Sequence, residues 1–170
     1  MYVCDSRVAR SDALALIAPA RELLEMSTEL GIPQHRGNAL VFLGWALASH
    51  GETSEGIMRA AEGLSIWAKT GWRAFVTRSL YLMGKSLLAA RRYTEGLGRV
   101  AQALDLGEKT GERCFMSPLH RLCAELTLHA RGAADETVGT SFRYALAIAR
   151  QQHAKGWELG AATSLARLWG

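Results

Sequence analysis

The stretch Lys69-Thr70-Gly71 recurs forty residues further along the chain as Lys109-Thr110-Gly111. Three other pairs share this interval: Gly31 and Gly71, Glu55-Gly56 and Glu95-Gly96, and Gly44 and Gly84. A dipeptide extends the pattern, because Gly63-Leu64 recurs as Ala103-Leu104 after 40 residues and as Ala145-Leu146 after a further 42. Several independent pairs with one offset indicate a repeated structural unit of about 40 residues.

Each repeat is predicted to contain two helices, named helix A and helix B. In the first full repeat, Leu40, Leu43 and Leu47 fall on one face of a helix A that spans 33–49. Gly51 then ends that helix, and a helix B runs on to Gly71, which suits a left-handed cap followed by an apolar residue. Gly31 and Gly156 are each followed by an apolar residue, so the same cap is expected there.

The rest of the chain follows the same pattern. The second repeat has Leu80, Met83 and Leu87 in its helix A, and the third has Leu119, Leu122 and Leu126. Upstream, residues 20–30 are predicted to form a helix B after Pro19, which suits a first helical position. Downstream, residues 157–169 form a helix A without its helix B. The predicted fold is all-α, an α-solenoid of antiparallel helix pairs with three full repeats and partial terminal ones.

The predicted domain division places a poorly defined N-terminal segment at 1–18 and one helical-repeat domain at 19–170. The chain has 170 residues, of which 49% are hydrophobic and 21% charged, so a packed core rather than disorder is expected. Small residues at Gly44, Gly84, Ala124 and Ala166 are expected where helix A meets helix B.

The N-terminal region carries a weak resemblance to a signal peptide, because Arg7 and Arg10 precede the mainly apolar residues 13–20. Asp5 and Asp12 interrupt that pattern, and the three cysteines are too few for a disulfide framework. We therefore predict a cytoplasmic protein. No stretch reaches the roughly 20 apolar residues of a membrane span, so no membrane association is expected.

The repeat resembles the tetratricopeptide repeat. In that family an apolar residue precedes a small one in helix A, a small residue opens helix B, and Ala-Leu follows near its end. Leu43-Gly44 and Met83-Gly84 match the first element, Gly56 and Gly96 match the second, and Ala103-Leu104 and Ala145-Leu146 match the third. The sequence departs from the family in its longer period and in lacking the proline after helix B.

A narrower resemblance rests on residues 43–48, 108–113, 145–152 and 157–169. These stretches are similar to the C-terminal repeat region of bacterial signalling proteins of the class III adenylate/guanylate cyclase type that have a central ATPase domain. The cyclase and ATPase domains are absent from this sequence, so no nucleotide activity carries over. The resemblance implies a regulatory or protein-interaction module.

The sequence favours no catalytic, metal or cofactor site. Gly96-Leu97-Gly98-Arg99 lacks the preceding strand of a phosphate loop. Cys114, His120, Cys123 and His129 do not have the spacing of a zinc finger or ribbon. We therefore expect no enzyme and no cofactor. The net charge of +4 permits anionic partners, but no nucleic-acid-binding module is recognisable, and no nucleic-acid partner is expected.

In tetratricopeptide proteins the A helices line a concave groove, and the resemblance implies a partner-binding groove here. Its predicted residues are Asn38, Val41, Trp45, Arg78, Tyr81, Lys85, Arg121 and Glu125. Trp45 and Tyr81 are expected to be anchors, and Lys85 and Arg121 to favour acidic groups or a C-terminal carboxylate. Phe42 and Leu82 lie next to these positions, and the core between repeats is the favoured place for both.

The predicted function is a non-enzymatic interaction or scaffold module, in bacterial signalling or regulation, that binds a protein or peptide in this groove. The alternative is a solenoid that senses a small-molecule effector and regulates a partner. A further prediction concerns the C-terminal helix, where Leu159, Leu165, Leu168 and Trp169 lack a covering helix B. Self-association through this helix and a frayed monomer are equally open on these grounds.

Overall fold

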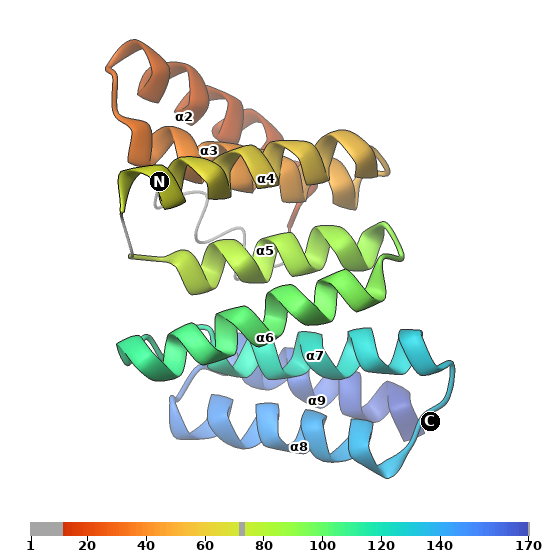
Figure 1. The fold of residues 1–170 in the computed structure, drawn as a ribbon. Helices are drawn as coiled ribbons and strands as arrows, with labels where there is room; N and C mark the ends of the chain where they lie inside the picture. Colours follow the sequence, from red (N-terminus) through yellow and green to blue (C-terminus); the bar gives the residue numbers. More distant parts are fainter. Residues whose placement is uncertain (1–11, 72–73, 170) are drawn as a thin grey trace.

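The computed structural model describes residues 12–71 and 74–169. Cys4, Arg7, Arg10 and the apolar residue expected after the Gly71 cap, Trp72, lie outside this part of the chain. The described residues form helices and no strand: η1 (Leu14–Leu16), α2 (Ile17–Glu29), α3 (Pro33–Ser49), α4 (Thr53–Thr70), α5 (Val76–Ala89), α6 (Tyr93–Thr110), α7 (Met116–Arg131), α8 (Glu136–Gln151) and α9 (Lys155–Trp169) (Figure 1).

The predicted helix pairs are confirmed, and α3 begins and ends at the expected residues. The largest difference is at α2, which begins at Ile17, so Pro19 is its third residue rather than its first. Just before α2, Leu16 is fully buried in the main hydrophobic core. The core of the described structure therefore includes residues from the segment expected to be poorly defined.

The helices form two layers of an α-solenoid. The A helices, α3, α5, α7 and α9, pack directly on one another in succession. Each of the B helices α4, α6 and α8 packs instead on the A helix before it and the A helix after it, as in Figure 1. Because successive A helices approach more closely than successive B helices, the A layer lies on the inner side of the stack.

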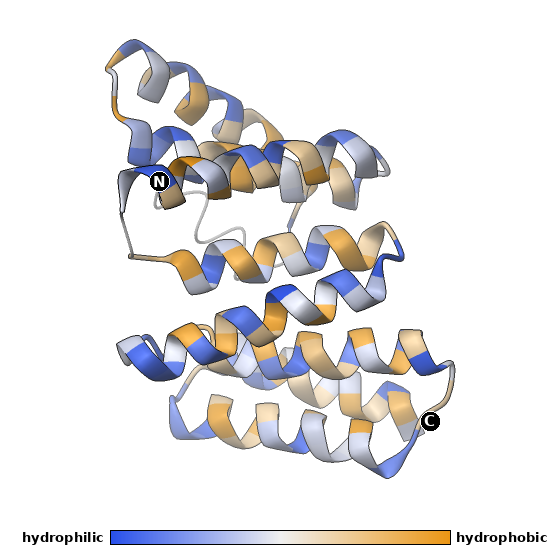
Figure 2. Cartoon of the chain, in the orientation of Figure 1, coloured by the Kyte–Doolittle hydropathy of each residue, from blue (hydrophilic) through white to orange (hydrophobic). Residues whose placement is uncertain are grey.

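The helix pair α3–α4 is held at short range by facing small residues. A Cβ atom on Gly44 would lie 2.5 Å from the carbonyl oxygen of Gly56 and 2.9 Å from the Cβ atom of Ala60. Residues 37–48 of α3 are buried without interruption, whereas Figure 2 shows hydrophilic and apolar residues alternating along α4 and α6. Gly84 and Ala124 are also buried, but Ala166 is exposed. Ala166 occupies the equivalent position on α9, and among the described residues no following helix B covers it.

The turns after the B helices share a left-handed residue. Gly31, Gly71 and Gly111 have φ values of 64°, 67° and 73°. In the next repeat the corresponding residue is His153, with φ 54°, and Gly156 lies inside α9. The cap expected at Gly156 is therefore three residues earlier. There a histidine, which has a Cβ atom, adopts a backbone conformation that usually favours glycine.

Candidate functional site: the inner face of the A helices

The repeat interval arranges the eight predicted groove residues in rows across α3, α5 and α7. Residues at 40-residue intervals lie opposite one another, and the rows are Asn38–Arg78, Val41–Tyr81–Arg121 and Trp45–Lys85–Glu125. In two of these rows the residue on α5 contacts the residue on α3. Arg78 Nη2 donates a hydrogen bond to Asn38 Oδ1 at 2.7 Å, and Lys85 Nζ lies 5.4 Å from the centroid of the Trp45 ring.

Five of these eight residues belong to the core. Asn38, Val41, Trp45, Arg78 and Tyr81 are each no more than 3% exposed. The expectation that Trp45 and Tyr81 stand open as anchors is not met in this structure, because both side chains are buried within the inner layer.

The Tyr81 ring makes aromatic contacts in this core. Its centroid is 5.6 Å from that of Phe115 and 6.4 Å from that of Trp157. Phe42 and Leu82 are buried too, in agreement with the core position favoured for them. By contrast Lys85, Arg121 and Glu125 are partly exposed, and their binding of a partner stays a prediction.

The buried guanidinium of Arg78 is held by aromatic rings as well as by Asn38. Its Cζ atom lies 4.9 Å from the centroid of the Phe42 ring and 4.7 Å from that of Phe75. A buried charge needs such partners, because removing it from water is costly. Arg78 therefore joins α5 to α3, which is a structural role rather than the predicted role in partner binding.

An open cleft lies where the rows reach α9. It has a volume of about 200 Å³ and is lined by Arg121, Glu125, Gly156, Trp157, Gly160, Thr163, Ser164 and Arg167. With the offset of 42 residues seen in the third repeat, the rows continue to Gly160, Thr163 and Arg167. These three residues were missed from the sequence, although extending the Ala103–Ala145 offset to α9 would have found them.

The charged residues that line the cleft are two arginines, Arg121 and Arg167, and one glutamate, Glu125, so positive charge is in excess. Arg121 Nη1 lies 2.5 Å from Glu125 Oε1, and Ser164 Oγ donates a hydrogen bond to the same carboxylate oxygen at 3.1 Å. Glu125 therefore balances the charge of Arg121. Arg167 is exposed and has no ion pair among the described residues. The cleft thus presents one unbalanced guanidinium beside a neutralised pair.

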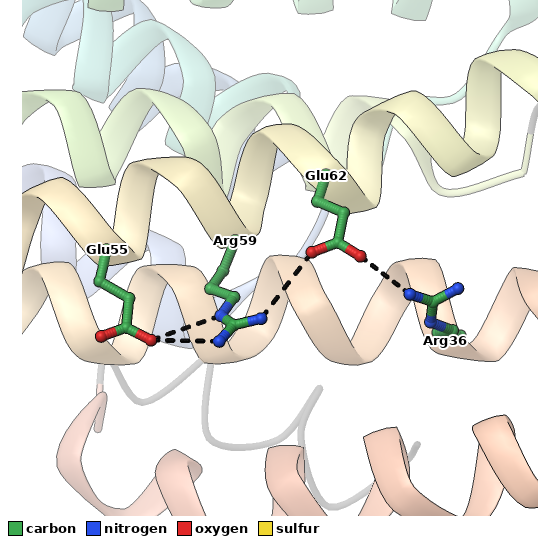
Figure 3. A network of polar contacts seen from close by, with 4 residues as sticks. All are labelled: Arg36, Glu55, Arg59 and Glu62. Carbon is green, nitrogen blue, oxygen red and sulfur yellow. Dashed lines mark hydrogen bonds and ion pairs between the residues drawn. The ribbon is translucent and has the colours of Figure 1, made fainter.

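Two larger clefts lie on the B-helix side, at positions one repeat apart. One, of about 470 Å³, is lined by residues that include Trp67, Val76 and Gln102. The other, of about 420 Å³, is lined by the corresponding Gly107, Met116 and Tyr144. At the equivalent positions of the first repeat, Arg36 Nη2 and Glu62 Oε1 form an ion pair at 2.9 Å (Figure 3). This pair belongs to a network with Arg59 and Glu55.

Two features are absent from the part of the chain that the structure describes, a metal-binding cluster and a membrane-spanning helix. Within 12–71 and 74–169, no three His, Cys, Asp or Glu side chains lie close enough together to hold a metal ion. Across the same ranges, every helix is too short or too polar to cross a membrane.

Comparison with known proteins shows the fold. No protein-family model matches the chain, and no curated protein matches it either. The chain is similar to the crystal structure of the apo form of RapI, with a TM-score of 0.70 and 12% sequence identity. The match covers 96% of this chain but 63% of RapI, so the chain spans under two thirds of that protein. The likeness confirms the helical-repeat solenoid predicted from the sequence.

Proposed function

We propose that this chain is a non-enzymatic interaction module that binds a segment of a partner protein on the inner face of its A helices. The observation that carries the proposal is the convergence of the residue rows on the cleft between α7 and α9. Arg121 and Glu125 were predicted as groove residues, and Gly160, Thr163 and Arg167 extend their rows into the same cleft. An interior lined by repeat-related side chains is a typical binding surface of solenoids.

The cleft favours an acidic protein segment over a small effector. Its volume of about 200 Å³ is below the roughly 300–1,000 Å³ of small-molecule pockets, so it suits one or two side chains of a longer chain. Arg167 has no ion pair among the described residues and can form charge-assisted hydrogen bonds with a carboxylate. We infer a partner segment with an aspartate, a glutamate or a free C-terminus at this point.

We further infer a regulatory role in bacterial signalling, in the cytoplasm. This inference rests on the sequence stretches that resemble the repeat region of cyclase-type signalling proteins, and on no structural observation. The absence of catalytic chemistry and of a nucleic-acid partner stays a prediction from the sequence. The small-molecule sensor remains the alternative, since the two clefts on the B-helix side, about 470 and 420 Å³ in volume, are of the right size for an effector.

The proposal is tested by selecting peptides from a random display library that has both free C-termini and internal acidic residues. The affinity of each selected peptide is then measured by fluorescence anisotropy for the wild type and for two variants. Arg167→Glu reverses the unbalanced charge in the cleft. Gly160→Glu adds a carboxylate beside Arg121, whose Nε atom lies 3.7 Å from the position of the added Cβ atom.

Both variants are expected to weaken binding by at least about tenfold, equivalent to about 1.4 kcal/mol. The matched control is Arg21→Glu, the same charge reversal at an exposed position on α2, which should leave the affinity unchanged. Circular dichroism verifies that each variant is folded. Selected peptides that bind all four proteins equally, or that lose affinity with the control alone, would show that the cleft is not the binding site.

A further inference from the structure

Helix α9 has an apolar face that points outward. Leu159 and Trp169 are 70% and 56% exposed, and Ala162 and Ala166 are exposed between them. Their spacing of three, four and three residues places all four on one helical face, called here the outer face of α9. One edge of the Trp169 ring rests on Gly139 of α8, and the rest of the ring is open. The inward face is different, because Ala161 is buried and Leu165 and Leu168 pack against the core of α7 and α8.

The outer face of α9 corresponds to the helix-B-binding face of the other A helices. The left-handed residues Gly31, Gly71, Gly111 and His153 fix the offsets between repeats as 40, 40 and 42 residues. With these offsets the four residues correspond to Gly37, Leu40, Gly44 and Leu47 of α3, to Thr77, Leu80, Gly84 and Leu87 of α5, and to Ser117, His120, Ala124 and Thr127 of α7.

In the earlier repeats this face is covered by a helix B. Gly44 of α3 meets Gly56 and Ala60 of α4, and a Cβ atom on Gly84 of α5 would lie 3.3 Å from Val100 of α6. Ser117 of α7 donates a hydrogen bond to the carbonyl oxygen of Ala145 in α8, at 2.9 Å. The outer face of α9 therefore continues an interface that the fold uses three times.

The small residues on this face resemble those of the tightest pair in the structure. In α3–α4, Gly44 and Ala48 of one helix meet Gly56 and Ala60 of the antiparallel helix. Each helix thus contributes two small residues four positions apart. Helix α9 carries the same arrangement in Ala162 and Ala166, so it has the residues that either side of such a pair requires.

The order of residues on the outer face is also symmetric, with large residues at both ends and small ones at the centre. In an antiparallel pair of two α9 helices, Ala162 of each copy would face Ala166 of the other, and Leu159 would face Trp169. The charged residue on this side of α9 is Lys155, one turn before Leu159 in the first turn of the helix, where it pairs with Glu158 at 2.9 Å. In this register Lys155 lies beyond the Trp169 of the second copy, so the contact between the two helices would bury no charge. A surface complementary to itself suits a twofold dimer, in which the contact is closed.

We propose that α9 pairs with the α9 helix of a second copy of this chain, antiparallel and through its outer face. This dimer is independent of the cleft between α7 and α9. The cleft is lined by Gly160, Thr163 and Arg167, which lie on another side of the helix. Partner binding and dimerisation can therefore fail or succeed separately.

Sedimentation equilibrium over a range of concentrations tests the dimer. The mass of the wild-type protein should rise from the 18.5 kDa of one chain towards twice that value. Ala162→Glu and Ala166→Lys, each alone, should stay at the mass of one chain, because each places a charge in an apolar contact. The matched control, Ala101→Glu, alters an exposed alanine on α6 and should dimerise like the wild type.

Mixing the two charged variants tests the antiparallel arrangement. In a mixed dimer the glutamate introduced by Ala162→Glu in one chain faces the lysine introduced by Ala166→Lys in the other. The mixture should therefore regain dimer that neither variant forms alone. Circular dichroism verifies folding of each variant. The proposal is overturned if the wild type stays at one chain mass at the highest concentration, or if Ala162→Glu dimerises as well as the wild type. Dimers of the wild type that the mixture fails to restore would exclude the antiparallel arrangement.

Discussion

Replacing Gly44 with alanine should destabilise the protein, although alanine is the better helix former. In an ordinary helix interior this change gains about 0.5–1 kcal/mol. Here the new Cβ atom would lie 2.5 Å from the carbonyl oxygen of Gly56 and 2.7 Å from the amide nitrogen of Ala60. Both separations are roughly 1 Å shorter than an ordinary contact of about 3.5–4.0 Å.

These neighbours are backbone atoms of α4, so they cannot move without shifting the helix. Overpacking of this kind costs about 1–3 kcal/mol and sometimes more. We expect the cost to exceed the gain in helix propensity and Gly44→Ala to lower the free energy of unfolding by about 2 kcal/mol. For a protein of this size, that corresponds to a fall in Tm of about 4–8 °C.

Gly98→Ala is the matched control, because Gly98 is exposed in the interior of α6 and its Cβ atom would meet nothing within 4 Å. This change should raise the stability by about 0.5–1 kcal/mol. Urea denaturation followed by circular dichroism measures both. If Gly44→Ala were as stable as Gly98→Ala, the close contact between α3 and α4 would not be the reason why position 44 requires glycine.

Three further predictions concern single side chains. Arg78→Ala should cost about 2–4 kcal/mol in urea denaturation, because it removes a buried side chain together with its contact to Phe42. The Asp135 carboxylate accepts a hydrogen bond from the backbone N–H of Val138, which holds the pKa of Asp135 below its usual value. The ionised Asp135 therefore stabilises the protein at neutral pH, and this stabilisation is lost as the pH falls through the lowered pKa. The denaturation midpoints of the wild type and Asp135→Ala should therefore converge in acid. Burial lowers the pKa of His120, so the unfolded chain takes up the proton first. Stability should then fall as the pH drops below about 6.5, less so in His120→Gln, and an NMR titration of the ring checks the lowered pKa.

The fold could be predicted because the repeat appears in the sequence as glycines and leucines at fixed intervals. Gly71 and Gly111 recur because each ends a helix in a left-handed conformation, with φ values of 67° and 73°. The prediction failed at Gly156, since His153 takes that conformation at the end of the third repeat. A histidine gives no sequence signal for such a turn, so the start of α9 was placed two residues late.

The candidate site was harder to predict, because periodicity shows which residues are equivalent but not which are covered. Trp45 and Lys85 occupy the same position in successive repeats, yet Trp45 is buried and Lys85 is partly exposed. Their exposure depends on how closely neighbouring A helices approach. The cleft residues on α9 were missed for a related reason, since two inserted residues shift that helix relative to the 40-residue interval.

The unequal packing of the helix pairs has a mechanical consequence. In α3–α4, glycines meet backbone atoms, whereas a Cβ atom on Gly84 or Gly96 would meet the ends of leucine side chains, those of Leu122 and Leu126. Side chains can change rotamer, but two backbones in contact leave no such freedom. The α3–α4 pair is therefore expected to resist deformation more than the junction between α7 and the helices α5 and α6 of the second repeat. Helix α7 carries Arg121 and Glu125 of the cleft, so a shift at this junction would move one wall of the cleft while the first repeat keeps its shape.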